Sequence, residues 1–246
     1  MSDLNATVID LEMTGLNART EKIIEIGAGK IRGGKIVETY TQLLNPGRKL
    51  SDETIRITGI TEEMVESCPS FAQIREEFLA FIGDDILLGH NVIFDYSFLK
   101  KAVINESPKG VRFERKGIDT LRIARRFLPG DQKKQLQALC EFYKIEYHAH
   151  RALDDALATH RLYEILWENY YKAGPDIFEP VPLVYQVKKE SPVMAKQIAQ
   201  ITRLTQQYGI ECPYDPEKMT KNEASRYIDK IKSMFGSVGG VSGESP

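Results

Sequence analysis

Apolar and polar residues first alternate with the period of a β-strand along this chain. Three apolar and β-branched segments, Ala6 to Leu11, Lys22 to Arg32 and Lys35 to Leu44, open the sequence, and Gly33-Gly34 separates the last two. A two-residue glycine loop between two such segments is typical of a β-hairpin. We therefore predict an antiparallel meander of three strands.

The period changes to that of a helix near residue 70, where Ser70 and Gln73 form the pattern of a capping box. The short apolar run Ile86 to Leu88 predicts a buried strand, and a helix is expected directly after it. A further short strand is expected at Ile118 to Leu121, followed by helices over 121–127, 135–143 and 153–170. Alternating helices and strands behind a meander predict an α/β fold with a mixed sheet flanked by helices.

Three prolines interrupt this pattern between Ala173 and Glu190 and exclude a continuous helix there. We expect a first domain over 1–172, a proline-containing linker over 173–190 and a small helical domain over 191–235. In that domain, Ser191-Pro192 predicts the start of one helix, and the capping-box pair Thr220 and Glu223 predicts the start of another. Residues 236–246 are rich in Gly and Ser and are expected to form a disordered tail.

Composition narrows the class of protein. The chain has 246 residues, a formal net charge of -2 and three cysteines without a CxxC pair, which argues against a disulfide framework or a zinc ribbon. Neither a membrane-spanning run nor a signal-type apolar segment is present, so a cytoplasmic protein is expected. Residues 1–184 carry 24 basic and 28 acidic side chains. This segment is therefore acidic and would need metal ions to bind a polyanion.

Two acidic residues, Asp10 and Glu12, follow each other at the end of the first predicted strand. The period of two points both side chains to one face, where like charges are unfavourable unless a cation lies between them. A third, Asp95, lies in the first turn of the helix after the Ile86 strand. Taken alone, Asp10 and Glu12 are also consistent with solvated carboxylates at a strand end. Asp95 alone is also consistent with an acidic residue that stabilises a helix N-terminus.

A histidine and an aspartate open the long helix near residue 153. His150 and Asp155 are spaced so that both can reach one point near the helix start, whereas Asp154 points elsewhere. By itself this cluster also fits a surface histidine beside helix-terminal acids. Together with the other acids, it supplies the hard oxygen ligands that Mg²⁺ or Mn²⁺ prefers. Two such ions can hold a phosphodiester, and His150 can take a proton from water.

Three segments of the sequence resemble the three motifs of the DEDDh 3'-to-5' exonucleases: Asp10-Leu11-Glu12-Met13-Thr14-Gly15-Leu16, Gly89-His90-Asn91-Val92-Ile93-Phe94-Asp95 and His150-Arg151-Ala152-Leu153-Asp154-Asp155-Ala156. That group includes the proofreading epsilon subunit of bacterial DNA polymerase III, ribonuclease T and oligoribonuclease. The resemblance covers roughly residues 6–170. It implies a ribonuclease H-like fold, a mechanism with two divalent cations, Mg or Mn, and release of nucleoside 5'-monophosphates from a 3' end.

The same resemblance assigns roles to individual residues. It implies that Asp10, Glu12 and Asp155 ligate metal, that Asp95 completes the site partly through water, and that His150 is the general base. It further implies that residues after the first acidic pair line the 3'-terminal nucleotide. The candidates for substrate contact are Met13, Thr14, Leu16 and Asn91. Covering the core is the alternative role for Met13 and Leu16, and a scaffold role is the alternative for Asn91.

The residues and the resemblance together predict an exonuclease that acts on single-stranded nucleic acid, and DNA is favoured. Its action at a free 3' end is what the resemblance implies. The alternative within enzymes is an RNA-trimming or oligoribonucleotide exonuclease, because Asp-Leu-Glu-Met-Thr-Gly, with Met13, resembles oligoribonuclease. The alternative of another class is a non-catalytic nucleic-acid-binding adapter of a replication or repair complex. A scaffold has no need of mutually repelling carboxylates beside a base. Two helices bury little surface alone, so the small C-terminal domain is expected to dock either on the first domain or on a partner. It is the candidate contact for a replication or repair protein.

Overall fold

The computed structural model describes residues 3–146 and 150–235. The chain divides into two compact units. The first comprises Met1–Pro46 and Leu50–Val187, and the second comprises Gly47–Lys49 and Lys188–Pro246. Within the described residues, no helix is both long and apolar enough to cross a membrane.

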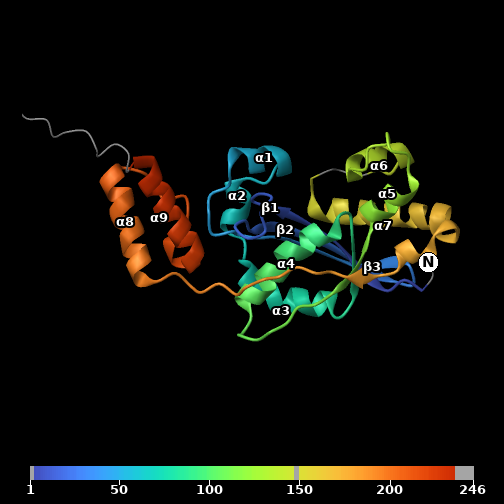
Figure 1. Cartoon of the computed structure of the whole chain (residues 1–246), viewed down its shortest axis with the longest axis horizontal. Helices are drawn as coiled ribbons and strands as arrows, with labels where there is room; N and C mark the ends of the chain where they lie inside the picture. The colour runs from blue at the N-terminus through green and yellow to red at the C-terminus, as the bar shows by residue number, and fades with distance from the viewer. Residues whose placement is uncertain (1–2, 147–149, 236–246) are drawn as a thin grey trace, which may run out of the picture. The chain divides into compact units, whose positions relative to one another are not determined.

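A six-stranded mixed sheet forms the centre of the first unit (Figure 1), with the strand order β3-β2-β1-β4-β5-β6. The strands are β1 (Ala6–Met13), β2 (Ile23–Arg32), β3 (Lys35–Leu43), β4 (Ile86–Gly89), β5 (Lys116–Asp119) and β6 (Val181–Pro182). The first three pair antiparallel, whereas β4 pairs parallel to β1 and β5 parallel to β4. Gly33 and Gly34 connect β2 to β3 with φ of 57° and 77°, a conformation that glycine adopts without steric cost. The predicted meander and mixed sheet are confirmed.

Helices cover both faces of the sheet. On one face, α3 (Phe71–Ile82) and α4 (Val92–Glu106) pack on Ile9 and Leu11. The other face is covered by α5 (Thr120–Phe127), α6 (Leu136–Tyr143) and α7 (Ala152–Tyr170), which share a core cluster with Val8. Because side chains alternate along β1, its apolar residues are buried on both faces. The acidic residues at its end therefore lie at the edge of a tightly packed core.

Two short helices, α1 (Asp52–Thr58) and α2 (Glu62–Glu66), were not predicted. The Ser51 hydroxyl accepts a hydrogen bond from the backbone N–H of Thr54 at the start of α1, and Gly59 ends that helix with φ of 68°. These helices are too short to show a clear apolar period, so sequence patterning could not find them. Strand β5 ends at Asp119, two residues earlier than expected, because the Asp119 carboxylate caps α5 through the N–H of Leu121.

The linker expected over 173–190 is largely part of the first unit, which extends to Val187. The 3-10 helices η1 (Tyr171–Ala173) and η2 (Pro175–Phe178) and strand β6 occupy this stretch. Phe178 and Leu183 are buried in the two core clusters. Prolines exclude a helix but fit the edge strand of a sheet, where the missing N–H breaks no ladder. The stretch contains no continuous α-helix, as expected, and the boundary between the two units after Val187 lies within the predicted linker.

The second unit contains α8 (Ala195–Tyr208), the 3-10 helix η3 (Pro216–Lys218) and α9 (Lys221–Phe235). Helix α8 begins at Ala195, not at Ser191-Pro192, because Pro192 pairs with Thr220 in an isolated bridge. The predicted capping box of α9 is confirmed: the Thr220 N–H donates to the Glu223 carboxylate at 2.8 Å, and the Glu223 N–H donates to the Thr220 hydroxyl at 3.2 Å. The tail expected over 236–246 lies outside the described residues.

Candidate active site

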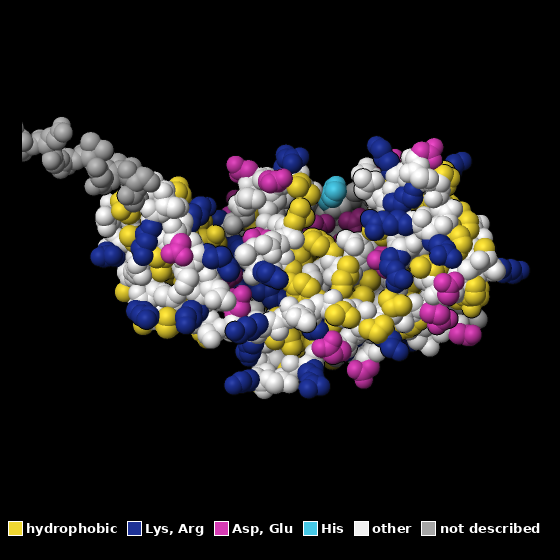
Figure 2. Space-filling model, viewed as in Figure 1, with side chains coloured by type: hydrophobic (Ala, Val, Ile, Leu, Met, Phe, Trp, Pro, Cys, Tyr) yellow, Lys and Arg dark blue, Asp and Glu magenta, His cyan; other side chains and the backbone are white. Residues whose placement is uncertain are grey.

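Three carboxylates from distant parts of the chain meet at the end of β1. One oxygen each of Asp10, Glu12 and Asp155 lies within 4.8 Å of the others. Asp10 and Glu12 share a face of β1, and α7 brings Asp155 onto that face. Acidic side chains and a histidine line a hollow between α1 and α6 (Figure 2). The structure thus brings together the acids of the first and third sequence motifs.

Asp155 lies in the first turn of α7, where its carboxylate accepts a hydrogen bond of 3.0 Å from the backbone N–H of His150. His150 is exposed and has a left-handed backbone with φ of 69°. This conformation is uncommon for residues other than glycine, although Asn, Asp and His adopt it more often than most, so local contacts must hold it. The candidate base is thereby fixed to a candidate metal ligand through its own backbone.

Asp95 lies in the first turn of α4 and is buried. Its carboxylate accepts a hydrogen bond of 3.1 Å from the backbone N–H of Leu11, the residue between the two acids of β1. The charge of Asp95 is one of the causes that raise the pKa of Asp10. Asp95 therefore belongs to the same electrostatic cluster, and its contact with β1 positions the strand end.

Burial and mutual repulsion raise the pKa of all four carboxyls. The pKa of Asp10 is raised well above its ordinary value, first by burial and then by the charges of Asp95 and Asp155. Burial raises the pKa of Glu12 to about 8, that of Asp95 to about 7 and that of Asp155 to about 6. Such a cluster holds protons unless a cation neutralises it. Closely spaced oxygen donors of this kind fit Mg²⁺ or Mn²⁺, so the residues present match the divalent cations expected from the sequence.

The substrate candidates of the first motif differ in their surroundings. Leu16 is 84% exposed, which removes the alternative that it covers the core, whereas Met13 packs against a core cluster. Thr14 is engaged by its own loop and by α1: its hydroxyl donates to Glu21 at 2.7 Å, and its carbonyl accepts from the Thr54 hydroxyl at 3.1 Å. Of these side chains, Leu16 is therefore the one exposed to a ligand.

Asn91 directly precedes α4 and is exposed. Its backbone is left-handed, with φ of 69°, and its N–H donates to the Asp119 carboxylate at 2.9 Å. These contacts describe a role in shaping the turn that leads to Asp95. Its side chain makes no cap hydrogen bond, so a substrate contact stays a prediction.

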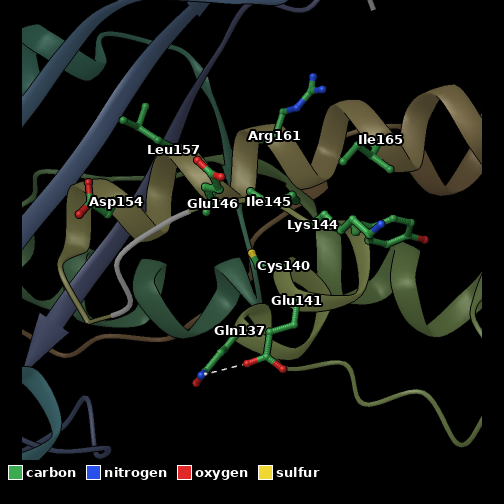
Figure 3. Close-up of a pocket in the computed structure, with 12 residues that line it drawn as sticks. Gln137, Cys140, Glu141, Lys144, Ile145, Glu146, Asp154, Leu157, Arg161 and Ile165 are labelled. Atoms are coloured by element: carbon green, nitrogen blue, oxygen red, sulfur yellow. Dashed lines mark hydrogen bonds between the residues drawn. The ribbon is translucent and has the colours of Figure 1, made fainter.

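A separate pocket of about 1010 Å³ lies between α6 and α7 (Figure 3). Asp154 lines it, together with Lys144 and Arg161, and none of the clustered carboxylates does. Asp154 therefore lines a pocket to which the clustered carboxylates do not contribute. Gln137 donates to Glu141 at 3.2 Å on its α6 side.

Sequence reasoning missed a fifth acidic residue next to this site. Glu25, on β2 directly opposite Glu12, is fully buried and forms an ion pair of 2.7 Å with Arg151. A glutamate inside the apolar run Ile23-Ile24-Glu25-Ile26 was the available signal, since a buried charge is rarely left unpaired.

Comparison with known proteins agrees with this geometry. The RNase T exonuclease family model matches residues 7–163. The chain is 35% identical over 169 residues to the DNA polymerase III subunit epsilon of Aquifex aeolicus, a match that covers 68% of this chain and 83% of that protein. It is 39% identical over 173 residues to the PolC-type DNA polymerase III of Thermotoga maritima, covering 70% of this chain and 12% of that one. The chain thus spans about an eighth of the length of the PolC-type polymerases it matches.

A solved structure of Exonuclease X in complex with 5' overhanging duplex DNA matches with a TM-score of 0.53 and 30% identity, over 67% of this chain and 92% of that one. This chain thus has the expected ribonuclease H-like fold, a mixed sheet flanked by helices. The matched segment contains all three sequence motifs. On this evidence, the chain belongs to the DEDDh-type exonuclease family that the RNase T model describes.

Proposed function

We propose that this chain is a divalent-metal-dependent 3'-to-5' exonuclease that removes nucleoside 5'-monophosphates from single-stranded ends of DNA. The observation that carries the proposal is the convergence of Asp10, Glu12 and Asp155 within 4.8 Å, with the backbone of His150 bonded to Asp155. Carboxylates packed this closely are unfavourable in a structural role, so a bound cation explains their presence.

Each residue has a role in the proposed reaction. Asp10, Glu12 and Asp155 hold divalent cations, and Asp95 completes the cluster and fixes the end of β1 through Leu11. Two such cations, when bound, supply positive charge to the phosphodiester and lower the pKa of the attacking water. His150 accepts the proton of that water, a task suited to a group whose ordinary pKa is about 6.5. The exposed Leu16 contacts the terminal base through its apolar side chain.

DNA is the proposed substrate because the relatives that match this chain are DNA polymerase III proteins, and Exonuclease X was solved with DNA. RNA is the second candidate, because Met13 stands in a motif that resembles oligoribonuclease. A replication or repair protein is the proposed partner, since the relatives are polymerases or a polymerase subunit. The helical pair α8 and α9 is the proposed contact for that partner.

A time course on 5'-labelled oligonucleotides tests the proposal. The substrates are single-stranded DNA, single-stranded RNA of the same sequence and a duplex with a 5' overhang, each with Mg²⁺, Mn²⁺ or EDTA. Asp10→Asn is the test variant, and Asp131→Asn, at an exposed position of the loop between α5 and α6, is the matched control.

We expect a metal-dependent ladder that shortens from the 3' end, made by the wild type and Asp131→Asn and not by Asp10→Asn. Faster shortening of RNA would favour the second candidate. Binding of either polymer without shortening would refute the enzyme and support the adapter. Cleavage in EDTA would refute the role of the metal.

A further inference from the structure

Three consecutive residues, His150, Arg151 and Ala152, donate hydrogen bonds to carboxylate side chains of the sheet and of α7. The His150 N–H donates to Asp155, as described above. The Arg151 guanidinium donates to Glu25 through Nε at 3.1 Å and through Nη2 at 2.7 Å. The Ala152 N–H donates to the other carboxylate oxygen of Glu25 at 3.1 Å.

Glu25 thus acts as a cap for a helix that is remote in sequence. Arg151 is the N-cap residue of α7, and its side chain makes no cap hydrogen bond to the helix. The N–H of Ala152, the first residue of α7, is bonded to a strand residue 127 positions earlier. A carboxylate at a helix N-terminus is favourable, and a buried one must be fully paired. These contacts make Glu25 the point at which the start of α7 is attached to the sheet.

Gly27, two residues after Glu25 on β2, permits a very close approach of α7 to the sheet. A Cβ at Gly27, opposite Asp10 on β2, would lie 2.0 Å from the carbonyl carbon of Ala152. The backbone of α7 therefore rests directly on β2 beside the carboxylate cluster. Glu25 thus holds the first residue of α7 by a hydrogen bond, and Gly27, two residues later, allows the α7 backbone to approach β2 closely.

We propose that Glu25 and Arg151 are positioning residues that hold the imidazole of His150 toward the scissile phosphate; this inference rests on the proposed function. Arg151 also offsets the negative charge of Glu25, which lies opposite Glu12 and would otherwise repel it. The planar guanidinium suits the two oxygens of Glu25, whereas a lysine supplies a single point charge.

The test is a double-mutant cycle between Glu25→Gln and His150→Ala, with Arg151→Gln as the second positioning variant. The side chain of Arg151 is half exposed, whereas that of Glu25 is buried. Arg151→Gln therefore breaks the ion pair without replacing a buried residue. Arg161→Gln is the matched control, because it breaks an exposed ion pair with Glu164 on the same helix. The readouts are kcat and KM on the 5'-labelled DNA, with the melting temperature of each variant.

We expect Arg151→Gln and Glu25→Gln to lower kcat by about 10- to 100-fold with little change in KM, the size of effect that a small misplacement of a catalytic group produces. In the His150→Ala background Glu25→Gln should lower kcat no further, since it acts through His150. Arg161→Gln should leave kcat unchanged. An equal loss of kcat in both backgrounds, or wild-type kcat in the positioning variants, overturns the inference.

Amide hydrogen exchange separates this inference from the proposed activity. The N–H groups of His150 and Ala152 should exchange about tenfold faster in Arg151→Gln than in the wild type or Arg161→Gln, because local opening becomes easier. Exchange unchanged in Arg151→Gln would refute the positioning role even if the exonuclease is active. Faster exchange in a protein without nuclease activity would keep the attachment of His150 and refute the proposed function alone.

Discussion

The backbone N–H of His150 donates a hydrogen bond of 3.0 Å to the carboxylate of Asp155, five residues later. This bond links the candidate base to a candidate metal ligand without using the imidazole. The side chain of His150 is therefore free for proton transfer while its backbone is held by the helix that carries Asp155. A substitution of the His150 side chain can therefore remove the proposed proton transfer and leave the backbone hydrogen bond to Asp155 in place.

His150→Ala keeps the backbone N–H and removes the imidazole. We expect kcat to fall by about 10²- to 10⁴-fold, the usual contribution of a general base, with oligonucleotide binding largely retained. Single-turnover cleavage in Mg²⁺ and equilibrium binding in Ca²⁺ measure the two quantities. Wild-type turnover would contradict the assignment, and a parallel loss of binding would indicate a structural role.

Asp10→Asn should abolish metal-dependent cleavage and at the same time stabilise the metal-free protein. The substitution removes one of several repelling charges from a buried cluster, and active sites commonly sacrifice stability in this way. We expect the melting temperature in EDTA to rise by a few degrees and the further rise on addition of Mg²⁺ to shrink. A lower melting temperature in EDTA would show that the carboxylate contributes a structural contact instead.

The stability of the metal-free protein should fall as the pH rises from about 7 to about 9. Burial raises the pKa of Glu12 to about 8, so the folded state holds a proton there that the unfolded state has already lost. His90 and His160, whose pKa values are lowered by burial, contribute the opposite slope, but only below their ordinary pKa of about 6.5.

Urea denaturation in EDTA at several pH values measures this slope. Glu12→Gln should flatten it, and saturating Mg²⁺ should reverse it, because metal binding requires deprotonated ligands. A wild-type stability that is constant or rises over this range would contradict the predicted proton uptake by Glu12.

Gly27→Ala should destabilise the protein by about 1–3 kcal/mol and lower its activity, because the added methyl group meets backbone atoms of Ala152 and Leu153. Backbone atoms cannot move aside as a flexible side chain can. Gly130→Ala is the control, since a Cβ there has no atom within 4 Å. Thermal unfolding of both variants checks the prediction, which fails if the two behave alike.

Much of the fold was predictable because its signals are local. The strand period of Ala6 to Leu11, the Gly33-Gly34 loop and the capping box of Ser70 and Gln73 each depend on residues close together in the chain, and all three occur in the structure. Signals that depend on a partner elsewhere in the chain did not reveal that partner. Pro182 marked the absence of a helix, but only its pairing with Lys116 makes it part of the sheet.

The sequence by itself determined the residues of the candidate site, since Asp10, Glu12, Asp95, His150 and Asp155 lie in three recognisable motifs. Only the tertiary structure decided how the third motif is attached to the first. Glu25 and Gly27 carry that attachment, and their partners, Arg151 and Ala152, lie more than 120 residues later. Periodicity and motif spacing describe neighbours along the chain, whereas the pairing of a buried charge and the approach of two backbones depend on which elements the fold brings together.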